Sequence, residues 1–143
     1  MPVNRTLMKL GGQVHAFWYR LLGGQLVGRA YGSDIVLLTT TGRKSGQKRT
    51  ATLLSMRDGD DIIVIASNGG NPMHPAWYQN LRANPEAEVQ IGGEKKRVRA
   101  ETAGREERAR LWPRIVEMNA GYERYQQGTK RTIPVVVLKP VGR

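Results

Sequence analysis

The stretch best suited to chemistry is a basic, glycine-bounded segment at residues 42–49, with the sequence GRKSGQKR. It carries four cationic side chains within seven residues: Arg43, Lys44, Lys48 and Arg49. Gly42 and Gly46 permit a tight loop whose backbone N–H groups turn outward, and such groups bind anions. The segment therefore predicts an anion-binding loop. The alternative is an ordinary basic turn whose charges are solvated.

The chain as a whole is strongly basic. Its 143 residues include 23 Lys and Arg against 12 Asp and Glu, a net charge of +11. Such a field attracts anions, whether nucleic acid, anionic lipid or a polyanionic small molecule. Charge alone does not choose among these partners, and a merely solvated basic surface is the remaining alternative.

Several kinds of chemistry lack the residues they need. The chain has no cysteine, which excludes disulfides and thiolate ligands and suits a cytoplasmic protein. His15 and His74 lie far apart, so we expect no metal site. Neither a phosphate-binding P-loop nor a GxGxxG motif occurs, and Ser67 and His74 lack a nucleophile-elbow motif around them. An enzyme with this sequence would need a cofactor to carry its chemistry.

Strands must hold the basic segment. The apolar run Ile35–Thr40 predicts a buried strand, and Arg49–Met56 predicts the next one. Asp58-Gly59 is a hairpin signal before a third strand, Asp61–Ser67. These connections are short, so the three strands should run antiparallel.

The remainder alternates between strands and helices. Pro75 should open a helix at Ala76–Ala83. Three later strands are predicted at Glu86–Ile91, Lys95–Glu101 and Ile133–Leu138. Between the last two of these strands we expect a helix at Arg105–Met118 and a loop or short helix at Asn119–Thr129. In the first of these strands Gln90 falls on the polar face, and Pro134 suggests that the last strand begins at an edge. The sum is an α+β fold, a small barrel of about six mostly antiparallel strands with helical insertions.

The N-terminal part predicts an amphipathic helix over residues 4–22, followed by a glycine-dotted loop. We therefore divide the single domain into an N-terminal helix and loop, 1–34, and a barrel, 35–143. The helix is basic and carries aromatics at 17–19, so it could lie on a membrane surface or simply pack on its own domain. No apolar run approaches the roughly 20 residues of a membrane-spanning helix. A cytoplasmic location follows, with the inner face of the plasma membrane as an alternative.

An ordered set of motifs resembles the deazaflavin-dependent nitroreductase family. The motifs are TTTGRKSGQKR at 39–49, ASNGG at 66–70, HPAWYQNLRANP at 74–85 and TKRTIPVVVL at 129–138. The resemblance implies a split β-barrel like that of flavin-nucleotide oxidases. It also implies binding of the deazaflavin coenzyme F-420, whose reduced form passes a hydride to a small electrophilic acceptor such as a quinone, nitroaromatic or enone.

The same resemblance implies a set of cofactor-binding residues. In the basic loop Arg43, Lys44 and Ser45, with Arg49, would hold the phosphate and the oligoglutamate tail. The deazaflavin ring would lie beside residues of the second strand, the third strand's end and the first internal helix, namely Thr50, Ala51, Thr52, Leu53, Leu54, Ile65, Ala66, Ser67, Asn68, Ala76, Trp77, Tyr78 and Asn80. Tyr122 would border ring and acceptor, and Ser67, Tyr122 and Tyr125 are the candidate catalytic hydrogen-bond donors.

The sequence departs from the family pattern at three positions. Asn68 stands where members often carry lysine, Leu54 where nitro-drug activators have tyrosine, and Asn119 where those activators have another aromatic. The resemblance therefore supports cofactor binding more directly than nitro-drug reduction.

Two further functions and two assembly states remain alternatives. One function is an FMN-dependent oxidoreductase on the same barrel. The other is a basic nucleic-acid-binding module, which the lack of ordered strand-borne aromatics disfavours, so we expect no specific nucleic acid partner. The protein could be a monomer or a homodimer.

Overall fold

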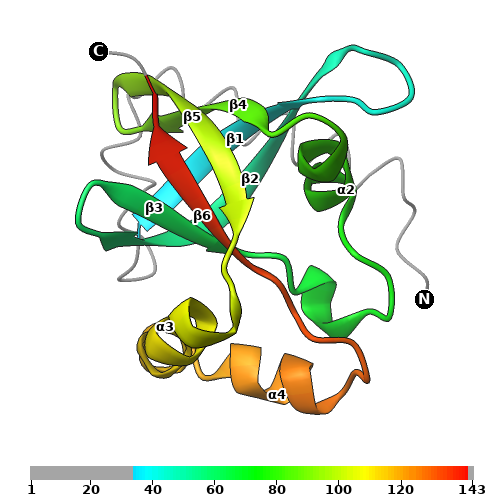
Figure 1. The fold of residues 1–143 in the computed structure, drawn as a ribbon, viewed down its shortest axis with the longest axis vertical. Helices are drawn as coiled ribbons and strands as arrows, with labels where there is room; N and C mark the ends of the chain where they lie inside the picture. Colours follow the sequence, from blue (N-terminus) through cyan, green and yellow to red (C-terminus); the bar gives the residue numbers. More distant parts are fainter. Residues whose placement is uncertain (1–33, 142–143) are drawn as a thin grey trace.

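The computed structural model describes residues 34–141, and six antiparallel strands form its closed barrel (Figure 1). The strands are β1 (Asp34–Thr41), β2 (Lys48–Asp58), β3 (Asp61–Ile65), β4 (Glu86–Ile91), β5 (Glu94–Thr102) and β6 (Val135–Pro140). They follow one another around the barrel in the order β1-β2-β3-β6-β5-β4, and pairing of β1 with β4 closes it. The expected α+β split barrel is confirmed.

The described part of the chain also contains four helical segments: η1 (Asn68–Gly70), α2 (Ala76–Ala83), α3 (Arg105–Met118) and α4 (Gly121–Gln127). The predicted bounds of α2 and α3 are confirmed. The expected helix over residues 4–22, and with it any membrane-surface contact, lies outside the described residues. Within residues 34–141, no helix is long and apolar enough to cross a membrane.

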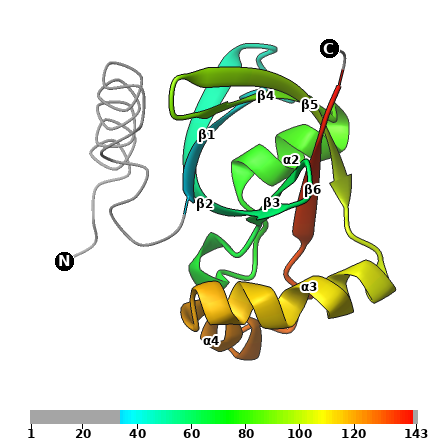
Figure 2. The same ribbon diagram turned by 90° about the vertical axis from the view of Figure 1, so that its left-hand side faces the viewer.

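Two of the three apolar clusters within residues 34–141 lie on opposite sides of the barrel wall. The first fills the barrel, where inward side chains such as Val36, Val64 and Leu138 are almost fully buried and α2 contributes Tyr78 and Leu81. The second lies outside, where Ile63 and Ile65 of β3 pack with Leu111 and Ile115 of α3 and with Tyr122 of α4. Figure 2 shows α3 and α4 side by side below the barrel, against the ends of β3 and β6. The alternation of side chains along β3 thus divides its residues between the two clusters.

The structure corrects three sequence-based expectations. The third strand ends at Ile65, so Ser67 precedes η1 and is not part of the strand. The last strand begins at Val135, because Pro134 has no N–H to donate and the Ile133 N–H donates to the side chain of Gln126. Gln90 is buried, because it lies opposite the buried Leu37 on the same face of the sheet.

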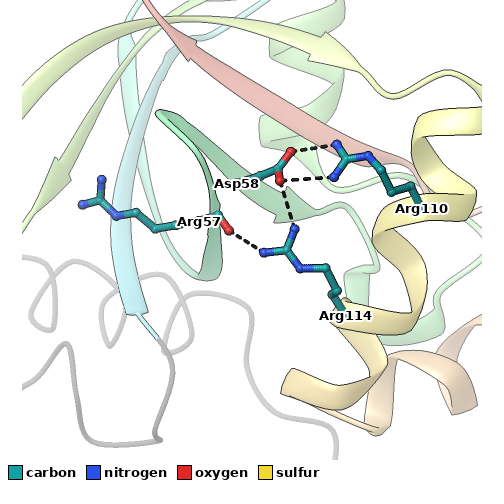
Figure 3. A network of polar contacts seen from close by, with 4 residues as sticks. All are labelled: Arg57, Asp58, Arg110 and Arg114. Carbon is teal, nitrogen blue, oxygen red and sulfur yellow. Dashed lines mark hydrogen bonds and ion pairs between the residues drawn. The ribbon is translucent and has the colours of Figure 1, made fainter.

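The β2–β3 hairpin is joined to α3 by a polar network (Figure 3). Arg110 donates two hydrogen bonds to the Asp58 carboxylate, at 3.2 and 2.8 Å. Arg114 donates to the same carboxylate at 2.9 Å and to the backbone oxygen of Arg57 at 2.8 Å. These arginines lower the pKa of Asp58 from 3.8 to about 2. The network fixes α3, and α3 in turn supports α4.

We expect Asp58→Asn to lower the free energy of unfolding at pH 7 by about 1 kcal/mol, since the pair is partly exposed and screened by solvent. Because the folded pKa is depressed, this stabilisation exists above the unfolded pKa of about 4 and disappears as pH falls toward 2. Urea unfolding at pH 7 and pH 3 measures both effects. The exposed Asp60→Asn serves as control and should change stability by less than about 0.5 kcal/mol. An Asp58→Asn deficit equally large at both pH values would contradict the ionic origin.

Candidate functional site

The basic segment forms a compact loop between β1 and β2. Gly42 N donates to Gln47 O at 2.8 Å, Gly46 N donates to Gly42 O at 2.8 Å, and Ser45 Oγ accepts from Gln47 N at 3.1 Å. Gly46 has φ +71°, and a Cβ on Gly42 would lie 2.7 Å from Ser45 Oγ. Both glycines are therefore required by the local backbone.

The loop presents its charges to solvent without neutralising them. Arg43, Lys44, Lys48 and Arg49 are all exposed. The ion pairs within residues 34–141 involve Glu94, Asp58 and Glu101, none of which lies in this loop or reaches its cations. Lys48 donates instead to Thr41 Oγ1 at 3.1 Å, which is a neutral partner. The loop is thus a concentration of unpaired positive charge, able to attract and hold an anion.

Asn80 of α2 anchors this loop from beneath. Its side chain is 5% exposed, and its Oδ1 accepts from Arg43 N at 3.1 Å and from Arg43 Nη1 at 3.3 Å. Its Nδ2 donates to Thr40 Oγ1 at 3.2 Å. In the structure Asn80 ties α2, the end of β1 and the start of the loop together. Asn80 therefore fixes the position of the loop, whether or not it also contacts a bound ligand.

Removing this anchor should have a measurable cost. We expect Asn80→Ala to lower the free energy of unfolding by about 1–3 kcal/mol, because it leaves the buried Thr40 hydroxyl and the Arg43 N–H without their partner. Thermal or urea unfolding measures the loss. Gln127→Ala removes an exposed helical amide, and this control should stay within about 0.5 kcal/mol of the parent. Equal stability of the two variants would show that the anchor is dispensable.

The β2 residues expected beside a ring divide between two faces of the strand. Pairing with β1 places Thr50, Thr52 and Leu54 opposite Thr39, Leu37 and Ile35 on the outer face. Ala51 and Leu53 take the other face, where Leu53 packs against the barrel core. The outer column runs from the basic loop past Leu54 to Met56, which pairs with Ile63 and packs against the outer cluster.

The first internal helix also divides its residues. Trp77 is partly buried against the barrel core, and Ala76 is exposed at the start of α2. The Tyr78 hydroxyl hydrogen-bonds to Thr102 Oγ1 at 2.8 Å, so Tyr78 faces β5 and not the basic loop. On that side an open cavity of about 350 Å³ lies between α2 and the strands β5 and β6; its lining includes Tyr78 and Arg82. None of the basic-loop residues lines this cavity.

At the far end of the outer column, the segment after β3 meets α4. Ser67 is 9% exposed, and its hydroxyl makes no capping bond to η1. Asn68 adopts φ +50°, which asparagine tolerates better than most residues, and its Nδ2 donates to Met73 O at 3.0 Å. A Cβ on Gly70 would lie 3.3 Å from Tyr125 Cα, so η1 and α4 are in close contact. Ser67 and α4 therefore share one corner of the molecule.

The two tyrosines of α4 differ in exposure. Tyr122 is 7% exposed and packs with Ile65, whereas Tyr125 is 38% exposed. Their rings form an edge-to-face pair with centroids 6.1 Å apart. Burial, and secondly the neighbouring Tyr125, raise the pKa of Tyr122 above its ordinary value of 10. The Tyr122 hydroxyl consequently stays protonated near neutral pH and can act as a hydrogen-bond donor.

One residue of this corner escaped the sequence analysis. Arg131 lies before β6 and hydrogen-bonds to backbone oxygens of the segment after β3. The only sequence feature that could have indicated Arg131 is its position in the motif TKRTIPVVVL, directly before a buried apolar run. The partners lie about sixty positions earlier in the chain, and no local pattern indicates them.

The expected residues thus gather in two groups joined by β2. The first holds the basic loop, Arg49 and Asn80, and the second holds Ile65, Ser67, Tyr122 and Tyr125. Leu54 lies on β2 between them, packed against Ile35 and Leu37 of β1. Within residues 34–141 no cluster of His, Asp or Glu side chains could hold a metal ion. The arrangement can bind a long anion at one end and offer neutral hydrogen-bond donors at the other.

Comparison with known proteins identifies the family. The model of the family described as "F420H(2)-dependent quinone reductase" matches residues 12–140. The Mycobacterium tuberculosis protein named "F420H(2)-dependent quinone reductase Rv1261c" is 42% identical over 146 aligned positions, covering 96% of this chain and 98% of that protein.

Two solved structures are similar over most of the chain. One, titled "Structure of F420-H2 Dependent Reductase (FDR-A)", has a TM-score of 0.68 and 42% identity over 73% of this chain and 93% of that one. The other, described as a domain-swapped dimer, has a TM-score of 0.69 and 35% identity, covering 87% of this chain and 99% of that one. The resemblance drawn from the motifs is confirmed, and with it an oxidoreductase that depends on coenzyme F-420. On this evidence the chain belongs to the F420H(2)-dependent quinone reductase family.

Proposed function

We propose that the protein reduces a small quinone-type acceptor, holding coenzyme F-420 along the outer face of β2. The observation that carries the proposal is the exposed, unneutralised cationic loop at one end of β2, with the Ser67 and Tyr122 corner at the other. The family supplies the cofactor and the reaction class. The positions of the basic loop and of the Ser67 and Tyr122 corner support the proposed orientation of the coenzyme along β2.

The residues present fit a long polyanion. Coenzyme F-420 carries a phosphate, a lactyl carboxylate and an oligoglutamate tail. The loop offers Arg43, Lys44 and Arg49, none of which forms an ion pair within residues 34–141. Arg43 Nη1 is held by Asn80, which fixes the guanidinium in place before any ligand arrives. Preorganised cations lose less conformational entropy on binding than free ones.

The protein's own residues would orient the reactants. When bound, the reduced coenzyme supplies the hydride. Thr50, Thr52 and Leu54 would form the floor beneath the ring, and the Tyr122 hydroxyl would donate a hydrogen bond to the acceptor oxygen on which negative charge develops. Ser67, whose hydroxyl makes no bond to η1, is the second candidate donor. The apolar cluster around Ile65 and Tyr122 would keep water from one side of the acceptor.

Three departures from the family pattern favour a quinone over a nitro drug. Leu54 offers an apolar surface and no hydroxyl. Asn119 Oδ1 accepts from Gly121 N at 2.9 Å, so its side chain supports the start of α4 and gives no aromatic wall. Asn68 lies in the η1 turn directly after Ser67, so this corner lacks the lysine cation that family members often carry there.

The proposal extends to the setting of the enzyme. We place it in the cytoplasm as a monomer or homodimer, since a solved relative is described as a domain-swapped dimer. Work at the inner face of the plasma membrane would depend on residues 4–22, outside the described part of the chain. The division of the chain at residue 34 is part of the same proposal.

The direct test is an anaerobic assay in which reduced F-420 is mixed with enzyme and a short-chain naphthoquinone. We expect enzyme-dependent return of the oxidised deazaflavin absorbance, with turnover saturating in both reactants. An active-site control replaces Tyr122 by Phe. If a folded sample that binds F-420 gives no reoxidation above the enzyme-free rate with any quinone, the proposed reaction is wrong.

A further inference from the structure

Arg131, in the corner that holds Ser67 and α4, makes five side-chain hydrogen-bond contacts. Its Nε donates to Asn71 O at 2.9 Å. Its Nη1 donates to Ala66 O at 3.2 Å and lies 3.1 Å from His74 Nδ1. Its Nη2 donates to Ser67 O at 2.7 Å and to Ala66 O at 3.2 Å. All four acceptors belong to residues 66–74.

These contacts use the full donor capacity of the guanidinium. A guanidinium has five N–H groups, and the five contacts occupy them all. Arg131 therefore has no N–H left for a phosphate or carboxylate, unlike the exposed cations of the basic loop. Its charge serves the protein's own backbone.

The histidine is in the correct state to accept one of these bonds. Burial first, and then the nearby Arg131 and Arg82, lower the pKa of His74 below its ordinary value. The ring packs edge-on against Tyr78, with centroids 4.9 Å apart. A neutral His74 whose proton sits on Nε2 presents its Nδ1 lone pair to Arg131.

The bonds of Arg131 define where Ser67 lies. The β3 pairing ends with Ala66 N donating to Pro134 O, and beyond that point the chain turns sharply into η1 through Asn68 at φ +50°. Ser67 makes no side-chain cap to this turn, so its hydroxyl does not hold it. Two of the three backbone oxygens that Arg131 contacts are those of Ala66 and Ser67 themselves. The position of the Ser67 hydroxyl consequently depends on the guanidinium.

We propose that Arg131 is a positioning residue for catalysis, holding the 66–68 turn so that Ser67 faces the acceptor side of the cofactor site. The inference rests on the proposed function and deepens it. Lysine could not replace this arginine, because an ammonium is a single point from which hydrogen bonds cannot reach four separated acceptors. Because the cofactor tail would lie at the basic loop, we expect substitution of Arg131 to lower turnover and to leave the affinity for the coenzyme little changed.

The experiment compares Arg131→Lys, Ser67→Ala and the double variant, with Lys130→Ala as a matched control one residue away. Lys130 is exposed. Each purified protein is titrated with oxidised F-420, assayed with reduced F-420 and a naphthoquinone, and melted to check folding. We expect Arg131→Lys to lower kcat about tenfold while the Kd for F-420 changes less than about threefold. Lys130→Ala should match the parent.

The double variant separates positioning from mere structural support. If Arg131 acts through Ser67, the double variant should be no slower than the slower single variant, because the effects are coupled. Rates that multiply, or an Arg131→Lys variant that loses only melting temperature with kcat unchanged, would overturn the inference. Should Arg131→Lys fail to fold, Arg131→Gln, which keeps two donors, takes its place in the same cycle.

Different results would refute the proposed function and the positioning role of Arg131. A parent enzyme that binds no F-420 or shows no quinone turnover refutes the function, and the positioning role falls with it. A parent that turns over normally beside an equally fast Arg131→Lys variant refutes the positioning role alone.

Discussion

Replacing Lys44 and Arg49 together by alanine is expected to weaken F-420 binding about a hundredfold. Each side chain is exposed, and each would make a charge-assisted contact to the phosphate or the glutamate tail. One such contact at a partly solvated site contributes roughly 1.4 kcal/mol, which is about tenfold in Kd. A fluorescence titration of the oxidised coenzyme measures the change. Arg43 is left intact because its guanidinium also bonds to Asn80.

The matched control for this prediction lies on β5. Lys95→Ala with Arg97→Ala removes the same two charges from another exposed strand and should change the Kd less than about threefold. Raising the salt concentration should weaken binding to the parent more steeply than binding to the loop variant, because fewer cations remain to be screened. Equal losses in the loop and β5 variants would mean that net charge, and not the loop, holds the coenzyme.

Tyr122→Phe is expected to lower kcat with a quinone by about tenfold to a hundredfold, with little change in the Kd for F-420. The substitution keeps the buried ring in its cluster with Ile65 and removes only the hydroxyl. The lost donor is one that would stabilise charge developing on the acceptor, an effect of about 1.4–2.7 kcal/mol. Stopped-flow mixing of reduced coenzyme and quinone measures it. Tyr125→Phe, at the more exposed ring, should cost much less.

The pH dependence gives a second check on Tyr122. Burial raises the pKa of its hydroxyl, so the proton is retained throughout the range below pH 10. The parent rate should therefore show no loss from Tyr122 ionisation between pH 6 and 9. A Tyr122→Phe enzyme as fast as the parent would remove Tyr122 from the mechanism.

The sequence predicted those parts of the fold that local patterns determine. The α2 helix follows Pro75 and ends before Asn84-Pro85, and its predicted bounds are confirmed. The β2–β3 hairpin turns at Gly59, which has φ +62°, as the Asp-Gly pair indicated. In both cases a proline or glycine determines the backbone conformation of residues only a few positions away in the chain.

Features set by distant partners could not be predicted in this way. The end of β3 depends on where β6 ceases to pair, so Ser67 fell outside the strand that periodicity suggested. Asn80 anchors a loop 37 positions earlier, and Arg131 binds oxygens 64 and 65 positions earlier. These contacts exist only once the barrel has closed. The exposure of the basic loop's four cations, by contrast, agrees with what its own residues indicate, and its anion binding stays a prediction.

Coenzyme binding by the basic loop is tested by a side-by-side titration of the parent protein with oxidised F-420, F-420 lacking its glutamate tail, and FMN, at two salt concentrations. We expect tight binding of the full coenzyme, weaker binding without the tail, and weak binding of FMN, with salt reducing the first most. FMN binding as tight as F-420, or no F-420 binding by a folded sample, would contradict this expectation.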